Sequence, residues 1–374
     1  MAKSILGVDV GSETLKLALV VGNQVRKAVA VPMPKNLVQD GRVISTETMG
    51  ELIREAMQEN GIHAQAAAYV LSNESVFVRN VVMPRMTAEQ LLYNIPYEFN
   101  DYITDDLKGY VFDYAMHTTL EELRGGTKNT GKAPDAEGDS DAAQEPSDNS
   151  DEEEAPEADQ AADFDEDEEL SAFGESMELM AVAAPASLID DARDMLRKAG
   201  LRLVRAAPTV SAYISLIRAM DGPSDREYCV LDLGYQAIRM YMFRGDRHVV
   251  TRVLEVGLSN LDSVVADYYN VDIHLAHTYL QTNYDDCHSK EFCVSAYNNI
   301  AVELMRALNF YRFSNPDSRL EDVWLCGGGA VIPTLRAAIA DTLDMKVHPA
   351  AELLPDGGFE NCNSFVQAVG ITMD

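Results

Sequence analysis

The chain has 374 residues, 47% of them hydrophobic, and a formal net charge of −31 at pH 7. This length allows two substantial hydrophobic cores, and because no run of 18 or more residues is apolar, the sequence predicts no membrane-spanning helix. Between residues 134 and 169 lie 18 acidic residues and no Lys or Arg, and the −13 carried by the rest still argues against a nucleic-acid partner, whose phosphates would be repelled.

Three strands and two turns are predicted at the start of the chain. The strand at 5–10 runs into Asp9-Val10-Gly11, a second strand follows, and Gly22-Asn23 marks a hairpin turn. Glycine lets backbone N–H groups approach a phosphate, and a carboxylate beside it can hold Mg²⁺ through water. Lys16, on the second strand, would bring its ammonium group near a transferable phosphate. The pattern predicts a phosphate site, although a single Asp-x-Gly turn is common in ordinary hairpins.

The next elements are predicted from caps and breakers. Thr46 is expected to cap a helix, and Pro84 stops a strand at 76–83. Thr87-Ala88-Glu89-Gln90 is a capping-box pattern that opens a helix towards Tyr97.

A long acidic segment follows. Residues 125–171 are mostly Asp, Glu, Ala, Pro, Ser and Gly, so they bury too little surface to offset their ordering entropy and are predicted to be disordered. The segment interrupts a hairpin of strands at 110–116 and 177–184, which is tolerated because closure entropy grows only logarithmically with loop length. A solvated loop without a partner is the simpler interpretation; a basic partner or an autoinhibitory role are the alternatives.

The N-terminal pattern returns after predicted helices at 187–198 and 209–219, with a short strand at 201–204 between them. A shift of 223 residues places the first copy on residues 228–242. The matched pairs are Asp9 with Asp232, Gly11 with Gly234, Leu15 with Ile238, and Lys16 with Arg239. Two copies predict two related domains that face each other, each aiming a carboxylate and a glycine turn at a shared cleft.

The last third of the chain adds a glycine-rich turn. Gly257 precedes one predicted helix, a long helix is predicted at 296–313, and a strand at 323–326 ends in Gly327-Gly328-Gly329. These glycines lack side chains, so a base or ribose could pack directly against their backbone. A helix is predicted after them at 331–343.

The remaining polar and apolar features are interpreted as structural. A cluster of histidines and cysteines could suggest a zinc site, but its spacing matches no ordinary zinc finger, so we interpret its members as surface residues. They are His274, His277, Cys287, His288 and Cys293. An odd number of cysteines without a Cys-x-x-Cys pair, and an N-terminus without an apolar signal segment, favour a reduced, cytoplasmic protein. The apolar end at 365–371 is too short and lacks a basic face for a membrane anchor.

Three motifs resemble those of the actin, Hsp70 and sugar-kinase superfamily. Asp9-Val10-Gly11-Ser12, Asp232-Leu233-Gly234 and Gly327-Gly328-Gly329 are similar to its phosphate-1, phosphate-2 and adenosine motifs. A finer resemblance is to the PilM family of type IV pilus assembly proteins, on the FtsA-like branch. Residues 82–103 resemble its strand, Leu-Pro and acidic helix, and residues 303–311 resemble its Glu-x-x-Arg-Ser-Leu-x-Phe-Tyr helix. The resemblance covers nearly the whole chain except the acidic segment.

The resemblance implies an α/β protein with the actin-like ATPase fold: two RNase H-like lobes around a nucleotide cleft, with an FtsA-type 1C subdomain (an SHS2 domain). The implied divisions are 1–83 and 208–225 for lobe 1A, with a C-terminal helix at 360–374; 84–207 for subdomain 1C; 226–255 and 320–359 for lobe 2A; and 256–319 for subdomain 2B.

It further implies that ATP and Mg²⁺ bind in the cleft, with Asp9 and Asp232 holding the metal through water. The residues implied to bind the nucleotide are Asp9, Gly11, Ser12, Glu13, Lys16, Asp232, Gly234, Tyr235, Gln236, Gly257, Glu303, Arg306, Gly327, Gly328 and Gly329. Two departures from the family stand out: Tyr235-Gln236 replace small hydroxyl residues, and Ala207-Pro208-Thr209-Val210 replaces an acidic segment. We therefore expect nucleotide binding with hydrolysis weak or absent, and assign no catalytic residue.

The implied function is a cytoplasmic scaffold of type IV pilus assembly, or of a competence or type II secretion-like machine, held at the inner face of the membrane by a partner. That partner is the N-terminal tail of a PilN-like inner-membrane protein, with the pilus motor ATPase as a further implied partner. Residues on or near the 1C helix that are implied to line the groove are Met86, Leu91, Ile95, Tyr97 and Phe99; packing of the helix on its sheet is the simpler interpretation of each.

Three other functions are alternatives to a pilus-assembly scaffold. An FtsA-like division protein would need a terminal amphipathic helix, and a small-molecule kinase of the same superfamily would need a clear carboxylate base. An actin-like ethanolamine-utilisation chaperone is more distant.

Overall fold

The computed structural model describes residues 4–39, 41–116, 176–220, 225–355 and 362–373. The chain falls into two units, one formed by residues 1–82, 86–117 and 178–374 and the other by residues 83–85 and 118–177. The first unit contains both large sheets and the pocket between them. The predicted disordered segment at 125–171 lies outside the described residues.

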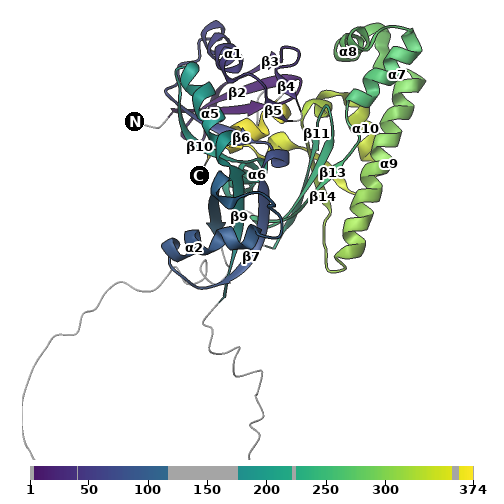
Figure 1. Cartoon of the computed structure of the whole chain (residues 1–374). Helices are drawn as coiled ribbons and strands as arrows, with labels where there is room; N and C mark the ends of the chain where they lie inside the picture. Colours follow the sequence, from purple (N-terminus) through teal and green to yellow (C-terminus); the bar gives the residue numbers. More distant parts are fainter. Residues whose placement is uncertain (1–3, 40, 117–175, 221–224, 356–361, 374) are drawn as a thin grey trace, which may run out of the picture. The chain divides into compact units, whose positions relative to one another are not determined.

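The first five-stranded sheet has the order β10-β6-β1-β2-β3 (Figure 1). Its strands are β1 (Ser4–Val10), β2 (Thr14–Val21), β3 (Gln24–Pro32), β6 (Ala66–Leu71) and β10 (Arg202–Pro208). The helices α1 (Thr46–Glu59) and α5 (Ala186–Lys198) pack their apolar faces on one side of it, around Leu6, Leu17 and Ile53. The cap of α1 differs from the expectation: Ser45, not Thr46, accepts a hydrogen bond from the backbone nitrogen of Thr48.

The second five-stranded sheet, of order β13-β12-β11-β14-β15, repeats the first. Its strands are β11 (Glu227–Leu233), β12 (Ile238–Arg244), β13 (Arg247–Leu254), β14 (Asp322–Cys326) and β15 (Lys346–Pro349). Asp9 lies opposite Lys16 in the first sheet, and Asp232 lies opposite Arg239 in the second. The register also shifts at matching places, between residues 19 and 20 and between residues 242 and 243, so the duplication extends to an irregularity of the strands.

Two helices lie between the sheets and give them a common core. They are α6 (Thr209–Ala219) and α11 (Val366–Gly370), which pack with Val20, Tyr241 and Trp324 from both sheets. A Cβ at Gly7, in the middle of β1, would overlap the carbonyl oxygen of Ala368. Only glycine therefore lets the backbone of α11 lie directly on the strand.

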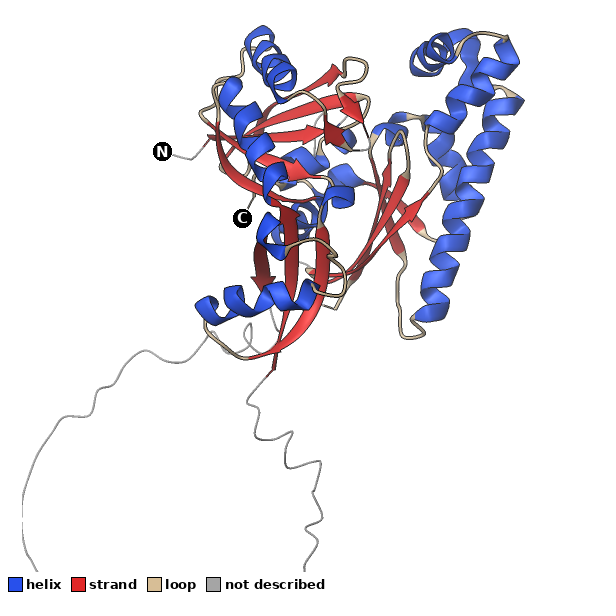
Figure 2. Cartoon of the chain, viewed as in Figure 1, coloured by secondary structure: helices blue, strands red, loops and turns tan. Residues whose placement is uncertain are grey.

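The outer face of the second sheet is covered by helices (Figures 1 and 2). They are α7 (Ser259–Tyr269), α8 (Ile273–Thr282), α9 (Glu291–Ser314) and α10 (Pro333–Thr342). The long helix predicted at 296–313 thus begins one turn earlier than expected.

Smaller elements follow β3 and β6 in the chain. A two-stranded hairpin joins β4 (Val38–Gln39) to β5 (Arg42–Val43), and a three-stranded sheet has the order β7-β9-β8. The latter contains β7 (Phe77–Pro84), β8 (Tyr110–Met116) and β9 (Ser176–Pro185), accompanied by α2 (Ala88–Asn94). β8 and β9 pair antiparallel, which confirms the hairpin that flanks the acidic segment. Thr87 and Gln90 form the predicted capping box at the start of α2.

Candidate functional site

A pocket of about 540 Å³ lies between the two large sheets. The first sheet contributes the turn after β1 and the start of β2, and the second contributes the turn after β11 and the loop after β14. The predicted nucleotide residues among its lining are Asp9, Gly11, Ser12, Glu13, Lys16, Asp232, Gly234, Tyr235, Gln236 and Gly328. The structure thus brings together one carboxylate and one glycine turn from each copy of the repeat.

Lys16 and two carboxylates form the polar centre of this pocket. The Lys16 ammonium lies 3.2 Å from Asp9 Oδ2, and both side chains are mostly buried. Burial by itself would lower the pKa of Lys16, but attraction to Asp9 and Asp232 outweighs it and raises the pKa. Lys16 is therefore a positive charge paired with Asp9 and attracted by Asp232.

Asp232 is held from the C-terminal helix. The side-chain amide of Gln367, in α11, donates to Asp232 Oδ2 at 3.0 Å and to the Tyr213 hydroxyl at 2.8 Å. Because α11 is packed into the core shared by the two sheets, this amide fixes the direction of the carboxylate towards the pocket.

Three glycines predicted to bind the nucleotide lie outside the pocket lining, where they let neighbouring loops approach the turn after β11 closely. Gly327 has a φ of +83°, and a Cβ there would overlap Asp232 Oδ1 and stand 2.9 Å from the backbone nitrogen of Leu233. A Cβ at Gly329 would stand 2.8 Å from Leu233 Cβ, and one at Gly257 would stand 2.7 Å from the carbonyl oxygen of Gln236. These glycines let the flanking loops pack against the turn after β11.

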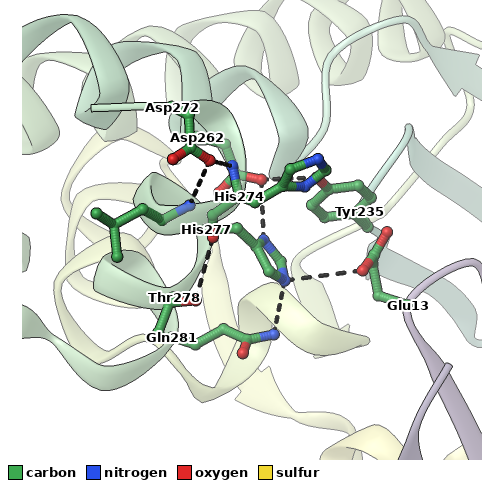
Figure 3. A network of polar contacts seen from close by, with 9 residues as sticks. Glu13, Tyr235, Asp262, Asp272, His274, His277, Thr278 and Gln281 are labelled. Carbon is green, nitrogen blue, oxygen red and sulfur yellow. Dashed lines mark hydrogen bonds and ion pairs between the residues drawn. The ribbon is translucent and has the colours of Figure 1, made fainter. Parts of the chain in front are cut away.

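A polar network built around His277 forms one wall of the pocket (Figure 3). His277 Nδ1 lies 2.9 Å from Asp262 Oδ2, and the Tyr235 hydroxyl donates to the same oxygen at 2.6 Å. His277 Nε2 contacts Gln281 at 2.7 Å and lies 3.7 Å from Glu13 Oε2, on the opposite side of the pocket.

Asp262 is the buried centre of this network. Its side chain is fully buried, and its Oδ1 has no hydrogen-bond partner among the described atoms. The hydrogen bond with Asp262 is the main cause that raises the pKa of His277 above its ordinary value. The helix that carries His277 is itself fixed at its start, where Asp272 accepts from the backbone nitrogens of His274 and Leu275 (Figure 3).

A second pair of opposite charges crosses the pocket. Arg239, the counterpart of Lys16 in the repeat, forms an ion pair with Glu74. Arg239 belongs to β12, whereas Glu74 lies in a short 3₁₀ helix (Asn73–Ser75) that follows β6. Two contacts at the pocket therefore join the first and second halves of the structure: Glu74–Arg239, and Glu13–His277, which is an ion pair when His277 is protonated.

Two glycine turns and an unpartnered amide oxygen, a hydrogen-bond acceptor, lie at this pocket. Two Asp-x-Gly turns face one space, and a Cβ at Gly11 would stand 3.0 Å from the carbonyl oxygen of Thr14, so this turn accepts no side chain easily. Asn73 lines the same space with a buried Oδ1 that has no partner among the described atoms. Within the described part of the chain, no group of three or more His, Cys, Asp or Glu side chains could hold a metal directly. The carboxylates of Asp9 and Asp232 are of the oxygen-ligand type that Mg²⁺ takes, directly or through water.

Comparison with known proteins identifies the family. The family model of the type IV pilus assembly protein PilM matches residues 7–123 and 160–353. The chain belongs to the PilM family. A PilM–PilN type IV pilus biogenesis complex is similar in structure, with 22% identity, a TM-score of 0.70, and coverage of 98% of this chain and 97% of that chain. A comparison with curated protein sequences finds no match.

The fold of this PilM family member extends to more distant relatives. The ethanolamine utilization protein EutJ from Carboxydothermus hydrogenoformans is 13% identical, with a TM-score of 0.53 and coverage of 98% of this chain and 88% of that chain. The predicted α/β, actin-like fold with two sheet-based lobes is confirmed by these likenesses. No helix in the described ranges is long and apolar enough to cross a membrane.

Two predicted nucleotide residues lie elsewhere. Glu303 and Arg306 form an ion pair with each other on the exposed side of α9, and neither belongs to the pocket lining. Conversely, His277 was read from the sequence as a surface residue and lies in the pocket wall. A sequence signal for this position exists. Asp272 is a helix cap, so α8 begins directly after it, and residues four apart in a helix, such as His277 and Gln281, lie on the same face.

The predicted partner-binding residues divide by exposure. Leu91, Ile95 and Phe99 are buried at 2%, 0% and 0% exposure, so they pack within the domain. Tyr97 is 56% exposed, and Met86 is partly exposed. The accessible side chains beside Tyr97 are ones the sequence reading did not select: Leu92, Tyr93 and Tyr102.

Proposed function

We propose that this PilM family member binds Mg·ATP in the pocket between its two large sheets. The observation that carries the proposal is that Lys16, Asp9 and Asp232 line one pocket, with Lys16 paired to Asp9 and each aspartate at the head of an Asp-x-Gly turn. The N–H groups of Gly11 and Gly234 donate within their own turns, to the carbonyl oxygens of Thr14 and Asp232. Backbone N–H groups of the residues that follow these glycines would bind phosphate oxygens, and Lys16 would contribute a positive charge. The loop at 327–329 would pack against the base or ribose.

Mg²⁺ would neutralise part of the phosphate charge in a pocket whose lining is rich in carboxylates. Asp9, Glu13, Glu74 and Asp232 all line it, against two basic side chains, Lys16 and Arg239, and the imidazoles of His277 and His288. A triphosphate without a metal would meet net repulsion there. Binding should therefore depend on Mg²⁺ and on both Asp9 and Asp232.

We propose that hydrolysis of the bound ATP is weak or absent. Thr209 lines the pocket at the start of α6, where the family has an acidic segment, and its hydroxyl donates to the carbonyl oxygen of Leu71. A threonine hydroxyl held in this way cannot act as a general base at neutral pH. A phosphate-release assay tests this: turnover above about 1 per second, the low end of ordinary enzymes, would contradict it.

Nucleotide binding is tested by thermal unfolding with Mg·ATP, Mg·ADP and no nucleotide. A ligand that binds only the native state, at 100 times its dissociation constant, adds about 2.7 kcal/mol to the free energy of unfolding. We expect a clear rise in melting temperature with Mg·ATP. No shift with either nucleotide at millimolar concentration would overturn the proposal.

We further propose that the protein is a scaffold of type IV pilus assembly that docks the cytoplasmic tail of a PilN-like inner-membrane protein. Family membership supports this function over a division protein or a small-molecule kinase. It also supports a cytoplasmic location at the inner face of the membrane through that partner, and the division into 1A, 1C, 2A and 2B given above.

The proposed docking surface is the exposed aromatic face around α2. Tyr93 and Tyr97 are 71% and 56% exposed, with ring centroids 6.1 Å apart, and Leu92 lies beside them in sequence. Tyr102 is held by Arg79, whose guanidinium stacks 3.8 Å from the ring centroid. Exposed rings of this kind favour an extended partner with apolar side chains, because aromatic anchors dominate binding energy at interfaces.

Titration of a synthetic PilN-like tail tests this surface. Tyr93→Ser and Tyr97→Ser should each weaken binding about thirtyfold or more, since truncated interface anchors typically cost about 2 kcal/mol or more. Phe313→Ser, at an 85% exposed aromatic position on α9, is the matched control and should change nothing. Equal affinity of all three variants and the wild type would place the tail elsewhere.

A further inference from the structure

The repeat gives the pocket a second basic side chain that the nucleotide motifs do not account for. Lys16 and Arg239 occupy equivalent positions, each opposite the aspartate of its own Asp-x-Gly turn. Both line the pocket, and the charge of Asp232 acts on both. The two cations therefore line one pocket and are both attracted by Asp232.

The guanidinium of Arg239 lies where phosphates are expected. A Cβ at Gly234 would stand 3.4 Å from Arg239 Nη1, so this nitrogen lies beside the glycine of the second turn. The side chain is 16% exposed, and burial would lower its pKa if Asp232 and Glu74 did not offset it. Arg239 is thus a well-buried charge that needs an anionic partner.

The partner that Arg239 has in this structure comes from the opposite half of the pocket. Glu74 is 36% exposed and lies in a single short turn after β6, so it can leave the pair at little cost. A phosphate group carries more negative charge than a carboxylate and offers several oxygens to the two-pronged guanidinium. A phosphate placed between Glu74 and Arg239 would replace the carboxylate.

We propose that Arg239 binds the terminal phosphate of the nucleoside triphosphate, and that Glu74 takes the place of this phosphate when it is missing. Arg239 is then a specificity-determining residue that favours ATP over ADP. The inference rests on the proposed nucleotide site and deepens it. A diphosphate leaves the Glu74–Arg239 ion pair in place, whereas a triphosphate exchanges it for a phosphate contact.

The test is calorimetric titration of the full chain with Mg·ATP and Mg·ADP. Arg239→Gln should weaken ATP binding about tenfold, the effect of losing one charge-assisted hydrogen bond, and leave ADP binding within about twofold. Arg239→Lys keeps the positive charge but loses the paired N–H donors of the guanidinium. Its affinity for ATP should therefore lie between those of the wild type and Arg239→Gln. Glu74→Gln removes the competing carboxylate and should strengthen ATP binding severalfold without affecting ADP.

Arg247→Gln is the matched control, because Arg247 also forms an ion pair between distant segments, with Glu178, but lies outside the pocket. It should leave both affinities unchanged. Equal loss of ATP and ADP affinity in Arg239→Gln, unchanged ATP affinity in that variant, or ATP binding no stronger in Glu74→Gln would each overturn the inference and leave the nucleotide site intact. If Arg239→Gln does not fold, Arg239→Lys and Glu74→Gln decide the question. A wild type that binds neither nucleotide overturns the inference together with the proposed function.

Discussion

Two adjacent glycines in the loop after β14 should respond very differently to the same substitution. At Gly327 the backbone has a φ of +83°, and a Cβ would overlap Asp232 Oδ1 and stand 2.9 Å from both the nitrogen and the carbonyl oxygen of Leu233. At Gly328 the nearest atom to a Cβ would be Leu258 Cδ1 at 3.7 Å, which is an ordinary contact. Gly327→Ala should therefore disrupt the approach of this loop to β11, and Gly328→Ala should not.

The expected cost of Gly327→Ala has two parts. Gly327 has a φ of 83° and a ψ of −179°, a backbone region essentially restricted to glycine, and an alanine there costs roughly 1–3 kcal/mol. Forcing an extra carbon into a closely packed site costs about 1–3 kcal/mol more, because the Asp232 carboxylate or the Leu233 backbone must move. The total of about 2–6 kcal/mol contrasts with Gly328→Ala, for which we expect less than about 1 kcal/mol.

Urea unfolding followed by circular dichroism measures this difference, with both variants and the wild type treated alike. We expect the midpoint for Gly327→Ala to fall clearly and that for Gly328→Ala to stay near the wild type. Equal midpoints for the two variants would show that the loop does not approach Asp232 as described, and would refute the reasoning about the glycine turn.

Three further outcomes follow from single contacts. Asp262 raises the pKa of His277, so the contribution of this pair to stability is fully present below about pH 6.5 and is lost as pH rises through the higher pKa of the folded protein. The melting temperatures of wild type and His277→Gln should therefore converge between roughly pH 6 and pH 9. A constant difference between them would contradict this. Gln367→Leu removes the amide that donates to Asp232 and to the Tyr213 hydroxyl, and should lower the free energy of unfolding by about 1–3 kcal/mol, as judged by urea titration. Thr87→Ala breaks the capping box of α2 and should cost about 1 kcal/mol, whereas an unchanged midpoint would mean that α2 does not unfold with the rest.

The repeat explains why so much of the architecture could be predicted from the sequence. A strand, an Asp-x-Gly turn and a second strand are local patterns, and their recurrence 223 residues later predicted two similar sheets and the pairing of Asp9 and Asp232 across one pocket. Local patterns also predicted the Thr87 capping box. They could not decide between the neighbouring hydroxyl residues Ser45 and Thr46 as the cap of α1, because both residue types cap helices.

The parts of the site that sequence reasoning missed depend on contacts between distant segments. His277 became a pocket residue because Asp262 and Tyr235, from other elements, meet it there. The pair Glu74–Arg239 joins residues 165 positions apart, and no local pattern predicts it. For the segment that contains α2, the sequence offered two interpretations, a partner groove and packing on a sheet. It could not tell that Leu91, Ile95 and Phe99 are buried while Tyr93 and Tyr97 are exposed.

The central claim is that the pocket binds Mg·ATP through Lys16 and the two aspartates, Asp9 and Asp232, that line it. Calorimetric titration of Mg·ATP into the wild type and Lys16→Ala tests it most directly, with Lys198→Ala as the control, since Lys198 forms exposed ion pairs with Glu47 and Glu51 outside the pocket. We predict binding of one nucleotide per chain in the wild type and in Lys198→Ala, and a loss of affinity of about tenfold or more in Lys16→Ala. Absence of binding in the wild type, or equal affinity in all three proteins, would contradict the account.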